Sequence, residues 1–357
     1  MFRGCRIPLC GCFGNPGDSD LGPAQARVGD EPETEPEEEK EKGAAVPRRF
    51  GWEEVEIATS SVVGEGGTST VYLARLPDSS LAAVKLHRPS ERLHRAFRQE
   101  LNVLLRLRHP HIVRLVGYCD ERVWIAIAEE EGALVFEYLP KGSLHEQLHG
   151  EGSGEVLPWA RRMAIAHQVA QALEYLHDGC DPQVVHGDVK SANVLLDARM
   201  EAKLCDFGSA RVGFSAAVAP PRSGRVMVVG SPGYVDPHYL RSGMVSKKSD
   251  VYSFGVLLLE LVTGEEAFDA ERERRLTAEM APVLRDPEGR TAEAVDVGLG
   301  GAYDFGEAAA MLATAAACLG NNPGLRPTMA EVVGMLRATA SASIAAVAAR
   351  LGGKTES

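Results

Sequence analysis

Two neighbouring stretches of the sequence carry oxygen-bearing side chains that could hold a metal ion. Asp188 and Asn193 lie in VVHGDVKSANVLLD, residues 184–197, and Asp206 lies in KLCDFGSA, which begins at Lys203. β-Branched or aliphatic runs flank both stretches, so we expect the three side chains in loops beside short strands. Carboxylate and amide oxygens suit Mg²⁺, a hard ion that prefers oxygen ligands. The pattern therefore predicts a magnesium site.

A glycine-rich stretch upstream could bind phosphate. VVGEGGTSTVY places Gly64, Gly66 and Gly67 between two predicted strands, where backbone N–H groups could approach phosphate oxygens closely. An isolated match of this kind is more often a glycine-rich hairpin turn.

A lysine and a glutamate further along form a second candidate pair. Lys85 ends the apolar run AAVK, where a lone lysine is ordinarily an edge residue that reaches to water. Glu100 lies on the next expected helix, on the same side as Phe97 and Leu104. Because an acid near an apolar face requires a cationic partner, we expect Glu100 to pair with Lys85.

The composition limits the class of protein. The chain has 357 residues, with 38 Lys and Arg against 50 Asp and Glu, for a net charge of -12. This acidic balance argues against a protein that coats nucleic acid, and no nucleic-acid partner is expected. The seven cysteines are an odd number without the paired spacing of a zinc site or a disulfide scaffold. We expect a cytoplasmic, reducing compartment.

The N-terminus raises the question of membrane attachment. No stretch approaches the roughly 20 apolar residues that cross a bilayer. Cys5, Cys10 and Cys12 lie close to the terminus beside arginines, a context in which S-acylation could tether the protein to the inner face of the plasma membrane. Three free thiols on a disordered tail are the equally weighted alternative. Phe2 excludes N-myristoylation, which needs glycine there.

The pattern of the chain predicts an α+β protein in three parts. Residues 1–47 read as a disordered acidic segment that includes the run Asp30–Lys42. Residues 48–338 read as the folded domain, with a β-rich lobe at about 50–139 and a mainly helical lobe at about 140–338. Residues 339–357 read as a helix or a loose tail.

Periodicity places the main elements of the two lobes. Strand runs are expected at 62–63, 70–76, 81–86 and 133–139 as one antiparallel sheet. One helix interrupts them, with Phe97, Leu101, Leu104 and Leu105 at helical spacing and Pro110 beyond its end. In the second lobe, helices are expected around the stripe from Ile165 to Leu176, at 251–262 and at 307–319.

Taken together, these motifs resemble those of eukaryotic protein kinases from about Val62 to about Leu336. LVFEYLPKGSL, GSPGYVDPHY, SDVYSFGVLLLELVTG and NPGLRPTM follow in the order typical of plant receptor-like kinases, the group that also includes Pelle-type kinases. The chain is similar to the receptor-like cytoplasmic kinases. The resemblance implies a two-lobed kinase fold, with a small antiparallel sheet and one main helix in the N-lobe and a mainly helical C-lobe. It also implies phosphorylation of serine or threonine in protein substrates, downstream of a membrane receptor kinase.

The resemblance also implies roles for individual residues. Lys85 would hold the α- and β-phosphates of ATP and be positioned by Glu100. Asp206 and Asn193 would bind Mg²⁺, or Mn²⁺ in its place, while Asp188 would orient the substrate hydroxyl and accept its proton. Lys190 would contact the γ-phosphate, and the loop from Gly64 to Val71, with Val63 before it, would fold over the nucleotide. Phe136 would be the gatekeeper, the backbones of Glu137 and Leu139 would bind adenine, and Val71, Ala83 and Leu195 would enclose its ring. His186, Phe207 and Leu104 would form an apolar stack that aligns the lobes.

The sequence departs from the kinase pattern at three places. Gly187 replaces the arginine that usually precedes the catalytic aspartate, so we expect activity to depend less on phosphorylation of the segment from Ser209 to Ser231. Ser69 replaces the third glycine of the phosphate loop, and its Cβ is expected to weaken ATP binding. His238 replaces the usual glutamate, so the buried ion pair with Arg326 cannot form unless another acid substitutes.

Two other functions stay open on the sequence. A pseudokinase scaffold that binds partners is favoured by Ser69 and His238 only. A small-molecule phosphotransferase resembling aminoglycoside or choline kinases shares the H-G-D-x-x-x-x-N string. Lys190, the GSPGYVDPHY segment and Asp250, which resembles the helix-starting aspartate that braces the catalytic loop, favour a protein kinase.

Overall fold

The computed structural model describes residues 46–65, 69–87, 91–120, 132–150, 156–213, 217–218 and 230–352. Several residues singled out by the sequence lie outside these ranges: Cys5, Cys10, Cys12, Gly66, Gly67, Ser215 and Ser223. All elements below belong to the described part of the chain.

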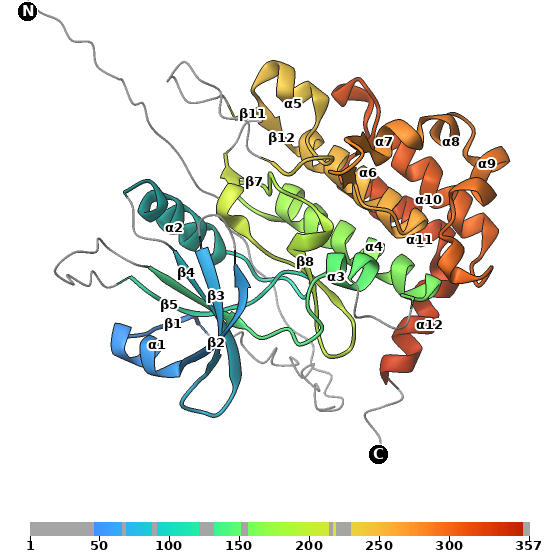
Figure 1. Ribbon diagram of the computed structural model, residues 1–357. Coiled ribbons are helices and arrows are strands. Elements are labelled where there is room, and N and C mark those ends of the chain that lie inside the picture. Colours follow the sequence, from blue (N-terminus) through green and yellow to red (C-terminus); the bar gives the residue numbers. More distant parts are fainter. Residues whose placement is uncertain are drawn as a thin grey trace, which may run out of the picture. The chain divides into compact units, whose positions relative to one another are not determined.

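A six-stranded sheet builds the first lobe. Its spatial order is β1-β5-β6-β4-β3-β2, with β1 parallel to β5 and every other neighbour antiparallel (Figure 1). The strands are β1 Arg48–Arg49, β2 Thr59–Glu65, β3 Ser69–Arg75, β4 Leu81–His87, β5 Leu115–Cys119 and β6 Ala133–Glu137. The four runs expected from the sequence are confirmed as β2, β3, β4 and β6. The sequence analysis missed β5, β1 and the short helix α1 (Trp52–Ala58).

The main helix of this lobe is α2, Glu91–Leu104. Phe97, Leu101 and Leu104 are buried, as the helical spacing predicted. Leu105 is exposed and lies just beyond the helix, which ends at Leu104, six residues before the proline at 110. α2 therefore packs its apolar stripe inward and brings Glu100, which is 1% exposed, to the sheet.

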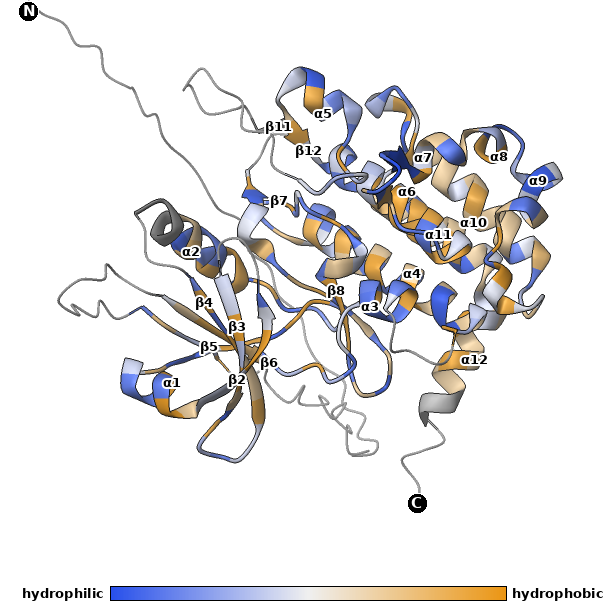
Figure 2. Ribbon diagram, viewed as in Figure 1, coloured by the Kyte–Doolittle hydropathy of each residue, from blue (hydrophilic) through white to orange (hydrophobic). Residues whose placement is uncertain are grey.

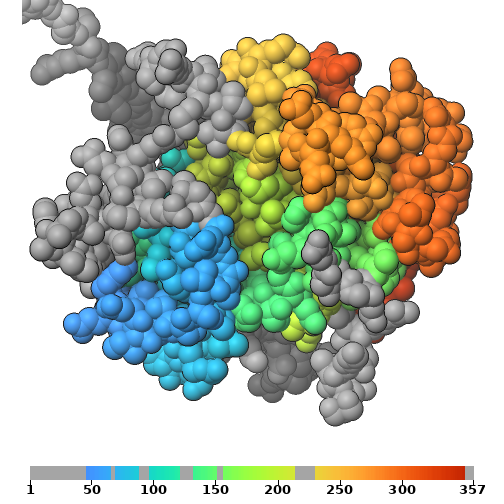
Figure 3. Space-filling view, viewed as in Figure 1, coloured from blue at the N-terminus to red at the C-terminus, as the bar shows by residue number. Residues whose placement is uncertain are grey.

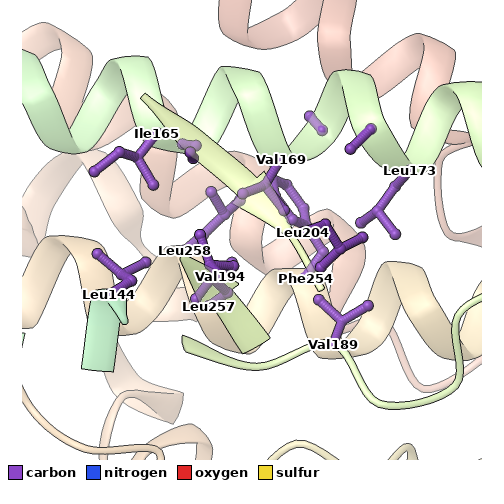
Figure 4. Packing of buried hydrophobic residues seen from close by; sticks show 14 of the residues in the cluster. Leu144, Ile165, Val169, Leu173, Val189, Val194, Leu204, Phe254, Leu257 and Leu258 are labelled. Carbon is purple, nitrogen blue, oxygen red and sulfur yellow. The ribbon is translucent and has the colours of Figure 1, made fainter. Parts of the chain in front are cut away.

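Helices dominate the second lobe, whose core is mainly apolar. α4 (Trp159–Glu174) continues into a π-helical turn at Tyr175–Gly179, and the stripe from Ile165 to Leu176 is buried. α6 (Lys247–Thr263) is buried almost along its whole length, and Figure 2 shows it as a mainly orange helix. Figure 4 shows Val169 of α4 and Phe254 of α6 pointing into the same cluster. These two helices form the core on which the site loops rest.

The other elements of this lobe differ in length, and α10, α11 and α12 are the longest of them. The remaining helices are α3 Leu144–His149, α5 Pro237–Ser242, α7 Leu276–Glu279, α8 Ala281–Arg285, α9 Pro287–Ala294, α10 Phe305–Cys318, α11 Met329–Thr339 and α12 Ser341–Gly352, with 3₁₀ turns at Ser191–Asn193, Phe207–Ser209, Val297–Leu299 and Pro323–Leu325. The strands are β7 Val184–Val185, β8 Val194–Leu196, β9 Ala202–Leu204, β10 Arg211–Val212, β11 Ala217–Val218, β12 Val245–Ser246, β13 Phe268–Asp269 and β14 Arg274–Arg275.

The C-terminal residues settle one alternative that the sequence left open. Residues 341–352 form the helix α12, which packs on α4 through Val347 and Ile344. Among the described residues, no single helix is long and apolar enough to cross a membrane. One bent pair, Met329–Thr339 with Ser341–Ala349, passes that test of length and composition together.

The two lobes lie side by side, the smaller coloured blue to cyan and the larger green to red (Figure 3). The antiparallel hairpin of β8 and β9 pairs Val194 with Leu204 and Leu196 with Ala202. Val113 lies just before β5. Its backbone N–H donates to the carbonyl oxygen of Leu204 and so holds this segment beside the hairpin. The fold therefore sets the loops after β7 and β9 against the sheet of the first lobe.

Candidate functional site

A cavity of about 550 Å³ lies between the sheet of the first lobe and the β8–β9 hairpin of the second. It brings together most of the site residues expected from the sequence. Those that line it are Val63, Gly64, Val71, Ala83, Lys85, Glu100, Phe136, Glu137, Leu139, Asn193, Leu195 and Asp206. Asp188 and Lys190 do not line it; Asp188 lines a small neighbouring hollow with Ser231.

Lys85 joins the two lobes at the back of this cavity. It lies on β4, and its Nζ is 2.8 Å from Glu100 Oε1 and 2.8 Å from Asp206 Oδ1. Glu100 comes from α2 and Asp206 from the loop after β9. The predicted Lys85–Glu100 pair is present in the structure, and Asp206 shares the same ammonium group.

The charges of this triad stabilise one another. Burial alone would lower the pKa of Lys85, but the two neighbouring carboxylates raise it. Burial raises the pKa of Glu100, and the Lys85 charge outweighs this and lowers it. For Asp206, burial also acts upward, yet Lys85 brings the pKa down to about 2. All three groups are therefore charged at neutral pH.

The sequence analysis missed a fourth member of this group. His87, two residues after Lys85 on β4, is buried, and its Nε2 lies 3.2 Å from Glu100 Oε2. A strand places alternate residues on one face, so the i, i+2 spacing of Lys85 and His87 was the available signal. Gln99 was missed as well. It donates its Nε2 to the Ala210 carbonyl at 2.7 Å and ties α2 to the segment after Phe207.

The loop between β7 and β8 presents Asp188 within a network of donors. Lys190 Nζ donates to Asp188 Oδ2 at 2.8 Å, and Ser231 Oγ donates to Oδ1 at 3.0 Å. Asn193 donates its Nδ2 to the Asp188 backbone oxygen at 2.8 Å and lies 3.2 Å from Oδ2. Lys190 also bonds Ser231 at 2.7 Å. The network fixes one carboxylate with both oxygens hydrogen-bonded.

Asp250, which the resemblance singled out for bracing this loop, is almost fully buried at the start of α6. It accepts the backbone N–H of His186 at 2.8 Å and that of Gly187 at 2.8 Å. His177 Nε2 lies 2.9 Å from the same carboxylate. Two backbone donors held by one buried carboxylate fix the loop directly before Asp188.

An apolar stack connects the lobes behind the cavity. His186 is fully buried, and its Nε2 lies 2.9 Å from the carbonyl oxygen of Cys205, to which it donates. Its ring lies edge-on to Phe207, with centroids 5.0 Å apart. Phe207 and Leu104 belong to one core cluster. The three residues that the resemblance assigned to such a stack therefore lie in the core.

The donor set fits a divalent metal bound to phosphate oxygens. The Asp206 side chain is 45% exposed and lines the cavity with Asn193. Because Asn193 turns its Nδ2 to Asp188, a metal would be bound by the other end of the amide, Oδ1. One carboxylate and one amide oxygen leave further positions of an oxygen-preferring ion to a phosphate and water.

Gly187 has a backbone conformation in which the arginine that most protein kinases have at this position would be strained. Its φ is +79°, and a Cβ built there would lie 2.9 Å from the Ser209 carbonyl oxygen. Arg211 occupies this region instead, donating to the carbonyls of Ser209 at 2.9 Å and Ala210 at 3.0 Å. The Arg211 guanidinium is therefore hydrogen-bonded within its own segment, and no phosphate group is needed to hold it there.

Ser69 lies at the start of β3, buried, and lines the cavity. Among the described non-glycine residues, those with positive φ are Ser79, Met200, Asp206 and Glu273. Ser69 is not one of them, so its backbone does not require glycine.

The expectation about Arg326 has a definite outcome, because another acid does substitute. Arg326 makes a two-pronged ion pair with Asp236, at 2.7 Å to Oδ2 and 2.9 Å to Oδ1, with both side chains 1% exposed. Asp236 also accepts the His238 N–H at 2.8 Å and so caps α5. The acid lies two positions before the histidine that was expected to leave Arg326 unpaired.

A pH dependence of stability follows from Asp206. Its pKa falls from 3.8 to about 2 on folding, so its pairing stabilises the protein above pH 3.8 and is lost as the pH falls toward 2. The free energy of unfolding, measured with urea and circular dichroism, should therefore fall more steeply over this range in the native protein than in Asp206→Asn. Parallel curves for the two proteins would contradict this.

Comparisons with known proteins agree with this geometry. Residues 57–335 match the protein kinase domain family. The chain is 56% identical over 365 residues to the salt tolerance receptor-like cytoplasmic kinase 1 of Oryza sativa subsp. japonica, covering 98% of each. It is 47% identical over 311 residues to a probable receptor-like protein kinase of Arabidopsis thaliana, covering 83% of this chain and 89% of the relative. A probable LRR receptor-like serine/threonine-protein kinase of Arabidopsis thaliana is 42% identical over 289 residues, which are 80% of this chain and 32% of that protein. The chain belongs to the protein kinase family, within its plant receptor-like cytoplasmic kinases.

Proposed function

We propose that this chain transfers the γ-phosphoryl group of ATP to serine or threonine hydroxyls of protein substrates, with Lys85, Asp188, Asn193 and Asp206 as the working set. The observation that carries this proposal is the convergence of the four side chains from three segments. Lys85 contacts Asp206 across the two lobes, and Asn193 contacts Asp188 within one loop.

In-line phosphoryl transfer needs little covalent help from a protein. Positioning and charge compensation therefore account for most of the rate. Lys85, held by Glu100, would compensate the α- and β-phosphates. Asp188, whose Oδ1 already accepts the Ser231 hydroxyl, would accept the hydroxyl of a substrate serine or threonine in the same way. Lys190 would neutralise the transferred group.

ATP and a divalent metal ion are the cofactors of this family, and we propose Mg²⁺, with Mn²⁺ able to replace it. Asn193 and Asp206 would bind the ion, whose positive charge would offset the negative charge of the phosphates. Around the base, the carbonyl and N–H groups of the segment from Glu137 to Leu139 would bind adenine, with Ala83 and Leu195 on either side of the ring. Phe136 also lines the cavity.

The experiment is transfer of labelled phosphate from ATP, with magnesium, to a panel of proteins and to small hydroxylated metabolites. Label in phosphoserine or phosphothreonine supports the proposal. Label in metabolites but never in protein would favour a small-molecule kinase, and no transfer at all would favour a binding scaffold.

We propose that the protein acts in the cytoplasm beside a membrane receptor kinase, with attachment through acylated Cys5, Cys10 and Cys12. This proposal is supported by the sequence context of the three cysteines and by the name of the rice relative. Cell fractionation of the native protein and of the triple Cys→Ser variant tests it. A shift of the variant from the membrane fraction to the supernatant is expected, and equal distribution would contradict attachment.

Activity should survive removal of the phosphorylatable serines that precede Ser231. Gly187 offers no cationic side chain for a phosphate, and Arg211 is already bonded to backbone carbonyls. The variant Ser209→Ala/Ser215→Ala/Ser223→Ala is therefore expected to keep most of its peptide phosphorylation rate. Ser231→Ala is the contrasting variant, because Ser231 contacts Asp188 and Lys190 directly and its loss should lower the rate. Collapse of the triple variant would contradict the expectation.

A further inference from the structure

Two histidines and a buried glutamate form a cluster outside the nucleotide cavity. His145 and His149 lie one turn apart on α3, and Glu260 lies on α6. One ligand atom from each of the three residues lies within 4.8 Å of the other two. Imidazole nitrogen and carboxylate oxygen are ligands that zinc accepts, and two histidines with one carboxylate are a known three-ligand set for it.

The closest pair in the cluster already has the spacing that a tetrahedral metal ion needs. His149 Nε2 and Glu260 Oε1 are 3.3 Å apart. An ion bound to both at about 2.1 Å, an ordinary zinc distance, would subtend an angle of about 105° between them, close to the tetrahedral value. The separation of these two atoms is therefore one that a zinc ion could bridge.

His145 supplies the third ligand after a small rotation of its side chain. Its ring centroid is 5.0 Å from that of His149, and its side chain is half-buried. The i, i+4 spacing on a helix places both rings on one face. Three protein ligands leave the fourth position of zinc to water.

Neighbouring side chains hold Glu260 in position. Glu260 is 1% exposed and accepts hydrogen bonds from the Tyr234 hydroxyl and from Ser191 Oγ at 3.2 Å. Such outer partners orient a ligating carboxylate. Figure 4 shows Leu144, the first residue of α3, pointing into the same apolar cluster as Leu257 and Leu258 of α6. Both helices that carry the ligands therefore contribute side chains to one apolar cluster.

We propose that His145, His149 and Glu260 form a zinc site that clamps α3 to α6. On binding, His149 would carry its proton on Nδ1 and give the Nε2 lone pair to the ion. α3 also supplies Glu146 to the nucleotide cavity. The clamp would therefore fix the helix from which that side chain reaches the cavity.

Zinc binding to the full-length chain tests this proposal. The protein should carry Cys5→Ser, Cys10→Ser and Cys12→Ser, because thiolates at the N-terminus would bind zinc themselves. Calorimetric titration with zinc chloride should show one equivalent bound and a higher melting temperature, whereas magnesium chloride at equal concentration should leave the melting temperature unchanged.

Variants locate the site. His145→Ala and His149→Asn should each weaken zinc binding by at least about 10-fold, comparable to the smallest losses seen on removal of supporting groups around a metal. His238→Ala, a half-buried histidine on α5, is the matched control and should bind zinc as before. Of the two variants, His145→Ala should disturb folding less. Its circular dichroism spectrum should match that of the parent protein.

Cobalt(II) gives a second readout of the ligand set. The expected spectrum has the intense visible bands of tetrahedral cobalt without a thiolate charge-transfer band. A thiolate band, zinc binding that is unchanged in both histidine variants, or no zinc binding at all would each overturn the proposal, leaving His149 and Glu260 as a plain hydrogen-bonded pair. These outcomes do not depend on whether the chain phosphorylates protein.

Discussion

Asp188→Asn is expected to lower kcat for peptide phosphorylation by about 10²–10⁴-fold, the range that a positioned general base contributes. The amide has nearly the shape of the carboxylate, but it cannot accept the proton of the substrate hydroxyl. Because Asp188 does not line the nucleotide cavity, the Kd for ATP should change little. Initial-rate kinetics with a peptide substrate, together with calorimetric ATP binding, measure both quantities.

A matched control exists on the same lobe. Asp178 pairs with Lys247 at 2.8 Å, the same separation as between Asp188 and Lys190, but on an exposed part of the surface. Asp178→Asn therefore makes the same chemical change and breaks a similar ion pair without touching the catalytic loop, so it should keep the native rate. Equal activity of Asp188→Asn and the native protein would exclude Asp188 as the base.

Breaking the buried pair of Arg326 and Asp236 is expected to have the largest effect on stability. Arg326→Met leaves the Asp236 carboxylate buried without its partner, which should lower the free energy of unfolding by about 3–5 kcal/mol. Asp236→Asn should cost a similar amount because it leaves the guanidinium uncompensated. Urea unfolding followed by tryptophan fluorescence gives both values.

The double variant separates the pair from its surroundings. With both changes present, the loss should be smaller than the sum of the two single losses, because no buried charge is left alone. Arg290→Met removes an exposed arginine that also contacts a carboxylate, Glu293, with two nitrogens, and it should leave stability nearly unchanged. Strictly additive losses at Arg326 and Asp236 would show that the two side chains do not stabilise each other.

The same pair shows where reasoning from the sequence stopped. A buried arginine requires an acid, and the pattern directed attention to the position of His238. The structure instead uses Asp236, because the turn before α5 directs this side chain both to the helix N-terminus and to Arg326. Sequence spacing alone does not say which of two nearby positions faces a residue 90 positions away.

Short motifs, together with the family resemblance that they carry, predicted many of the residues in the cavity and in the neighbouring hollow of Asp188. Asp188 and Asn193 lie in one loop, which leads into β8. Asp206 lies in the loop after β9, the strand that pairs with β8. Short spacing along the chain therefore brings the three residues together. Lys85 and Glu100 were paired from polarity alone. His87 could not be found in this way, because nothing in the sequence says that its strand face meets the acid of α2.

Elements without strong periodicity were the ones missed. β5 contains Gly117 and begins soon after Pro110, two residues that favour turns and so obscured this strand in the sequence. α12 has no strong cap signal in the sequence. Its contact with α4, where Val347 is 7% exposed, explains its helical structure better than intrinsic propensity does.

The most direct measurement of the central claim is ATP binding to the native chain and to Lys85→Met and Asp206→Asn, with and without magnesium, by calorimetry. The account predicts saturable binding to the native protein that strengthens with magnesium, weaker binding for Lys85→Met, and loss of the magnesium effect for Asp206→Asn. ATP that fails to bind at millimolar concentration, or that binds all three proteins equally whether or not magnesium is present, would contradict it.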